Sequence, residues 1–132
     1  MHDPIKLFTI ISLLLLPTVM FGGYSLLRLL PKEKLTPYQH VWFRAGHAHA
    51  GVLLVLSLLV LDIVSRTTLR VELRWVVCLA LLVGALAQSG GMFIHMAVGK
   101  PGAWSSGNTV TTLGAVLLAT ATVLVAVGLI AT

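Results

Sequence analysis

The chain has 132 residues, of which 58% are hydrophobic and only 10% are charged. About a quarter of the residues in a soluble domain are charged, so this composition excludes an ordinary soluble domain. The formal net charge is +5. The basic residues are spread over the ends of apolar segments and do not form one patch, so we expect no nucleic-acid partner.

Four segments of the chain are long and apolar enough to cross a lipid bilayer, which requires about 20 residues in a helix. They cover approximately residues 5–30, 41–64, 71–96 and 107–131. Lipid offers the backbone no hydrogen bonds, so each segment should be helical. Because the connections are short, we predict an all-α fold: one four-transmembrane-helix domain, residues 1–132, packed as an up-down-up-down bundle.

Basic residues near the segment ends do not determine the orientation in the membrane. The N-terminal side, together with the second connection, carries Lys6, Arg66, Arg70 and Arg74. The opposite side carries Arg28, Lys32, Lys34, Lys100 and, near the start of the second segment, Arg44. Four basic residues against five leave the positive-inside rule undecided. Asp62 and Arg66, four residues apart, are expected to pair along one helix.

The fourth segment carries no charge, and small residues recur in it every seven positions: Gly107, Gly114, Ala121 and Gly128. Small residues in register form a seam along one helix face and allow close approach of a second helix. This seam predicts either packing within the bundle or an interface between copies in a homo-oligomer.

Ionisable side chains inside membrane spans are costly and often mark functional sites. His40, Arg44, His47 and Gly51 share one face of the second helix, at steps of four, three and four. Gly84, Gln88, Gly91 and His95 repeat this spacing on the third. We expect antiparallel packing to bring both stripes together in one membrane half, near Asn108. The predicted ligand-binding residues are Arg44, His47, Gln88, His95 and Asn108.

His49 lies two residues after His47, which is about 200° around a helix. The two imidazoles therefore point to nearly opposite sides and would not share one metal ion on a regular helix. They could serve separate sites, and in that sense His47 and His49 are candidate metal ligands.

The His-x-His pair at His47 and His49 resembles the His-x-His helix of the haem–copper oxidase superfamily, whose two histidines bind haem irons on opposite faces. The similarity covers Gly46 to Leu56. It implies a b-type haem or a transition metal as cofactor, bound by His47 and His49, with His95 as a further candidate ligand. The chain also resembles small bacterial four-span proteins without an assigned activity, which implies location in a bacterial inner (cytoplasmic) membrane.

Arg44 followed by His47 or His49 resembles the Arg…His motif of the membrane-associated eicosanoid and glutathione metabolism family. Those proteins also have four spans. The Asn and Glu that follow the family's His are absent here, where Ala48, Ala50 and Gly51 stand.

Three functions remain open from the sequence. The first is a membrane protein that binds haem, a metal or an anionic small molecule at the His/Arg/Gln site. The second is a glutathione- or lipid-modifying enzyme that uses Arg44. The third is a structural or small-solute-handling protein without a cofactor. Whether the protein is an enzyme is not determined by the sequence.

Overall fold

The computed structural model describes residues 2–131, which form four long helices joined by short connections. They are α1 (Ile5–Leu29), α2 (Pro37–Ser65), α3 (Val71–Val98) and α4 (Ser106–Ile130), and a 3₁₀ turn, η1 (Leu30–Lys32), follows α1. All four helices are long and apolar enough to cross a membrane. The predicted all-α, four-span fold is confirmed, and the chain is an integral membrane protein.

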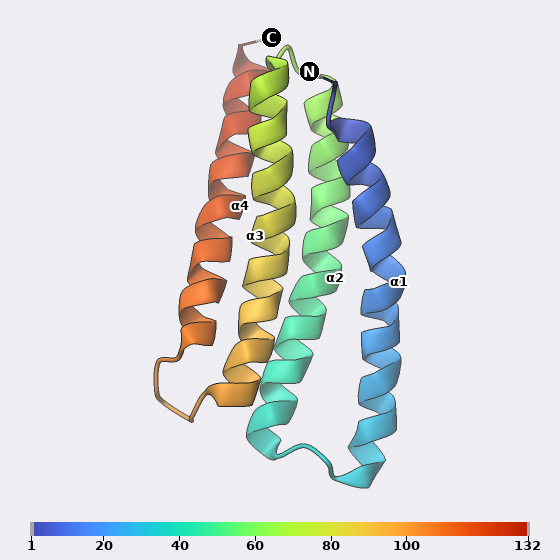
Figure 1. Ribbon diagram of the computed structural model, residues 1–132, viewed down its shortest axis with the longest axis vertical. Coiled ribbons are helices and arrows are strands. Elements are labelled where there is room, and N and C mark those ends of the chain that lie inside the picture. The colour runs from blue at the N-terminus through green and yellow to red at the C-terminus, as the bar shows by residue number, and fades with distance from the viewer. Residues whose placement is uncertain (1, 132) are drawn as a thin grey trace.

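The helices lie side by side in chain order, each antiparallel to the next, with both termini at the same end (Figure 1). α3 packs most extensively on α4, then on α2, whereas α1 packs mainly on α2. Within the described residues α1 and α4 do not touch. The up-down-up-down arrangement is therefore confirmed, but the bundle is open, and its two outer helices each have one main neighbour.

α2 begins four residues before the expected start at residue 41 because its N-terminus is capped. The Thr36 hydroxyl accepts a hydrogen bond from the Gln39 N–H at 3.2 Å, and the Gln39 side chain accepts one from the Thr36 N–H at 3.0 Å. Pro37 follows at the first helical position, where its missing N–H costs nothing. These capping interactions stabilise the first turn although its hydropathy is low. His40 is therefore part of the helix.

The small-residue seam of α4 packs against α3. Gly107, Gly114, Ala121 and Gly128 are all buried. A Cβ added to Gly114 would lie 2.8 Å from the Gly84 carbonyl oxygen, and one added to Gly91 would lie 2.6 Å from the Gly107 carbonyl oxygen. The two backbones are thus in direct contact. Packing within the bundle therefore accounts for the seam, and its four small residues are buried without a second copy of the chain.

Three ion pairs among residues 2–131 lie at the end of the bundle that holds the termini, and one of them links segments distant in the chain. Asp62 and Arg66 pair as expected, and Arg70 lies 3.4 Å from Glu72. Arg74 of α3 pairs with Asp3, next to the start of α1, and only 19% of its side chain is exposed. The indole N–H of Trp75 donates to the His2 carbonyl oxygen at 3.0 Å, which fixes the start of α1 against α3.

Candidate functional site

The polar stripe of α3 faces α4. Its two glycines meet the α4 seam, and the Thr111 hydroxyl of α4 donates to the backbone oxygen of Gln88 at 3.3 Å. Further along, a Cβ on Gly107 would lie 2.7 Å from the Cα of His95. The spacing that puts these residues on one face of α3 is as predicted. Their neighbour is α4, however, and not the stripe of α2.

The polar stripe of α2 faces α1. The imidazole of His47 lies beside Gly22 and Gly23, where a Cβ on Gly23 would come within 2.9 Å of His47 Nε2. One turn further along α2, a Cβ on Gly51 would lie 3.7 Å from the Val19 side chain of α1. The Gly22-Gly23 pair therefore makes room for His47, a role that the sequence analysis missed although the pair stands out in an apolar segment.

The two stripes thus point to different neighbours, and the shared cavity expected between them does not form. His47 packs against α1, and His95 packs beside α4. Arg44 is exposed, and its side chain takes part in none of the ion pairs among residues 2–131. Arg44, His47 and His95 are not brought together.

His95 is buried, with 4% of its surface exposed, and its neighbours engage it on several sides. Its ring centre lies 4.2 Å from that of Trp42, edge to face, and 5.8 Å from that of Tyr38. The Tyr38 hydroxyl donates to the His95 backbone oxygen at 3.3 Å. Tyr38 and Trp42 are four residues apart on α2 and so share a face. The sequence analysis did not connect that pair with His95.

His95 also starts a hydrogen-bonded chain into the cap of α4. Its Nδ1 lies 2.6 Å from the Ser105 hydroxyl oxygen, and that hydroxyl donates to the Asn108 side-chain oxygen at 3.2 Å. The same Asn108 oxygen accepts the Ser105 N–H at 2.9 Å. The Ser105 hydroxyl oxygen thus contacts both the His95 ring and the Asn108 side chain. Asn108 and His95 are therefore brought together, in a contact that joins α3 to α4.

His49 has one ring nitrogen hydrogen-bonded, and its side chain lines a hollow on the surface of α2. Its Nδ1 lies 2.9 Å from the Ala45 backbone oxygen. A carbonyl oxygen can only accept, so Nδ1 carries the hydrogen and Nε2 keeps its lone pair. The hollow has a volume of about 190 Å³ and is lined by Ala48, His49, Val52 and Leu53. His49 and His47 diverge as the helical period predicts.

The register of α2 against α3 brings His49 level with Gln88. Trp42 touches His95 across the antiparallel pair. His49 lies seven residues after Trp42, and Gln88 lies seven residues before His95. Seven residues make about two turns of a helix. His49 and Gln88 therefore lie at the same depth, on the helix faces that carry Trp42 and His95. The side chains of His49 and Gln88 are each half-buried.

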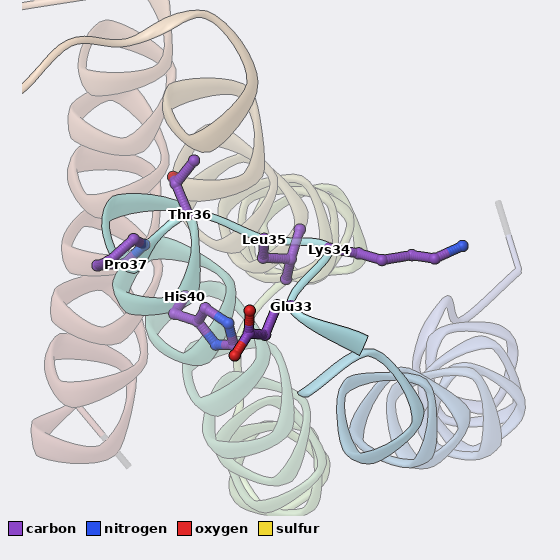
Figure 2. Close-up of a pocket in the computed structure, with 6 residues that line it drawn as sticks. All are labelled: Glu33, Lys34, Leu35, Thr36, Pro37 and His40. Carbon is purple, nitrogen blue, oxygen red and sulfur yellow. The ribbon is translucent and has the colours of Figure 1, made fainter. Parts of the chain in front are cut away.

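No group of three or more His, Cys, Asp or Glu side chains that could hold a metal ion occurs in the described part of the chain. A larger hollow, of about 500 Å³, lies in the connection between α1 and α2 and contains none of the predicted ligand-binding residues. Figure 2 shows Glu33 and His40 with their polar ends toward one another in this hollow, while Lys34 extends away from it.

Comparison with known proteins identifies no relative: no protein-family model, curated protein or solved structure matches the chain.

Proposed function

We propose that this membrane protein binds b-type haem, with Nε2 of His49 as an axial ligand of the iron. The observation that carries the proposal is the hydrogen bond from His49 Nδ1 to the Ala45 backbone oxygen, 2.9 Å long. It selects the tautomer with a free Nε2 lone pair. Histidines that bind metals commonly donate their other ring nitrogen to a carbonyl or carboxylate, which orients the ring and raises its basicity.

The donor set fits a haem better than a bare metal ion. The porphyrin supplies four equatorial nitrogens, so the protein needs to contribute only one or two axial ligands. A protein-ligated ion needs more ligands than one imidazole, and the described residues offer no cluster of three.

The walls of the hollow are also compatible with a porphyrin. Ala48, Val52 and Leu53 present apolar surface beside His49. The volume of about 190 Å³ is smaller than a porphyrin, so part of the group would lie outside the hollow and contact lipid. When bound, haem would supply electron transfer or the binding of a small ligand at iron.

Residues of this chain have separate roles in the proposal. Ala45 holds the His49 ring in position, and Gln88 is a polar side chain at the same depth on α3. His95 is not assigned as a ligand, because it is buried and the rings of Trp42 and Tyr38 pack against its imidazole. A glutathione or other anion site on Arg44 and His47 gains no support, since Arg44 is exposed while His47 packs against α1.

Absorption spectra of the purified protein test the proposal. After expression with a haem precursor, the wild-type protein should show a Soret band that shifts on reduction. His49→Ala should remove the band, and imidazole added to His49→Gly should restore it. His47→Ala, on the same helix, is the matched control and should retain haem.

Two results would overturn the proposal. One is a wild-type protein without a Soret band and without haem by pyridine haemochrome assay. The other is a His49→Ala variant that keeps its haem. Size-exclusion profiles of every variant separate loss of haem from loss of folding. A folded, haem-free wild-type protein would leave a structural or small-solute-handling role as the remaining hypothesis.

A further inference from the structure

The two ends of the bundle differ in how their basic residues are compensated. At the end that holds the termini, three of the four basic residues pair with carboxylates: Arg66 with Asp62, Arg70 with Glu72, and Arg74 with Asp3. At the other end stand Arg28, Lys32, Lys34, Arg44 and Lys100, with Glu33 as the single carboxylate. None of the ion pairs among residues 2–131 lies at that end. The two ends hold nearly equal numbers of basic residues, but most of the positive charge without an ion pair lies at the end opposite the termini.

Arg28 at this end is held in place above an apolar hollow. Its Nε donates to the Tyr24 hydroxyl at 3.0 Å, and its guanidinium carbon lies 5.4 Å from the centre of the Tyr24 ring. The hollow, about 350 Å³, is lined by Phe21, Tyr24, Ser25, Arg28 and Leu29 of α1. Phe21 is 67% exposed, so the hollow opens on the lipid-facing side of the helix. The positive charge of Arg28 therefore lies at the level of the helix end, with apolar surface below it.

We propose that this part of α1 is a binding site for an anionic phospholipid. The two terminal nitrogens of Arg28 take no part in the hydrogen bond to Tyr24. They can therefore donate hydrogen bonds to two phosphate oxygens. One acyl chain would lie in the hollow beside Phe21 and Leu29. The neighbouring uncompensated basic residues favour an anionic headgroup over a zwitterionic one, because each Lys or Arg near the surface adds attraction.

The site is independent of the haem proposal. Arg28 is on α1, which packs mainly on α2, and none of the residues that line its hollow lines the hollow at His49. A protein that lacks haem would still bind lipid here, and loss of lipid would leave the Soret band in place.

Native mass spectrometry of the detergent-purified protein tests the lipid site. The probes are phosphatidylglycerol, phosphatidylcholine and, as a headgroup without acyl chains, glycerol 3-phosphate. The wild-type protein should retain phosphatidylglycerol in preference to the other two. Arg28→Gln should reduce retention about fivefold, the effect of one basic residue near the surface. Arg66→Gln, at the opposite end and paired with Asp62, is the matched control and should retain lipid as the wild type does.

A second variant separates the acyl-chain contact from the charge. Ser25→Leu fills the hollow and keeps Arg28, so it should also weaken retention of phosphatidylglycerol. Thermal unfolding in detergent verifies that each variant is folded. The proposal is overturned if Arg28→Gln and Ser25→Leu both retain lipid at the wild-type level, or if Arg66→Gln loses as much as Arg28→Gln. Retention of glycerol 3-phosphate equal to that of the lipid would also overturn it, since the site would then be one for free phosphate.

Discussion

The indole of Trp42 lies edge to face against the imidazole of His95, with the two ring centres 4.2 Å apart. This contact joins the start of α2 to the end of α3, next to the hydrogen bond between His95 and Ser105. Three helices therefore meet at one histidine, because Ser105 is the cap of α4. This buried contact is thus a junction between helices.

Replacing Trp42 should weaken that junction. An aromatic pair of this kind contributes about 1 kcal/mol beyond the area it buries, so Trp42→Ala should lower the midpoint of thermal unfolding in detergent, and Trp42→Phe should lower it less. Trp104 is 72% exposed, and Trp104→Ala serves as the control for removing an indole. Equal midpoints for Trp42→Ala and Trp104→Ala would show that the contact with His95 adds nothing.

Two adjacent glycines of α3 should respond in opposite ways to alanine. A Cβ on Gly91 would overlap Thr111 and lie 2.6 Å from the Gly107 carbonyl oxygen, whereas a Cβ on Gly90 meets nothing within 4 Å. Gly91→Ala should therefore force α3 and α4 apart, at a cost of about 1–3 kcal/mol. Gly90→Ala should stabilise the helix by up to about 1 kcal/mol. Unfolding of both variants in the same detergent measures the difference; a Gly91→Ala protein as stable as Gly90→Ala would contradict the close packing of the seam.

Arg74 should matter more than the other paired arginines. Besides Asp3, it donates to the backbone oxygens of Thr67 at 2.9 Å and Leu69 at 3.0 Å. Arg74→Gln should loosen the start of α1, by about 1 kcal/mol or more, which hydrogen exchange of the first turn of α1 would record as faster exchange. Arg66→Gln removes an exposed pair within one helix and should have little effect. Unchanged exchange in Arg74→Gln would rule out this role.

Cys78 is the only cysteine of the chain, and it is fully buried. A buried thiol in an apolar interior reacts slowly because the thiolate is the reactive form. Cys78 should therefore resist a maleimide in the folded protein and react once the protein is denatured. A cysteine introduced at the exposed Ser106, in a Cys78→Ala background, should react at once. Rapid labelling of native Cys78 would contradict its position in the core.

The sequence alone determined the features that depend on neighbouring residues. Hydropathy predicted four helices, because in lipid an apolar segment of this length satisfies its backbone only as a helix. The helical period likewise predicted that His47 and His49 point in different directions. The start of α2 could have been predicted too, since Thr36, Pro37 and Gln39 form its capping pattern.

Only the tertiary structure decided which helix each polar face meets. Periodicity groups His40, Arg44 and His47 on one face, but it does not say which neighbour that face contacts. The glycines of α3 and α4 allow those two backbones to touch, so the glycine face of α3 packs on α4, while the His95 ring also contacts Trp42 of α2. The face of α2 with His47 then meets Gly22 and Gly23 of α1. Which helix each polar face contacts therefore depends on the side-chain volumes of residues that are distant in the chain.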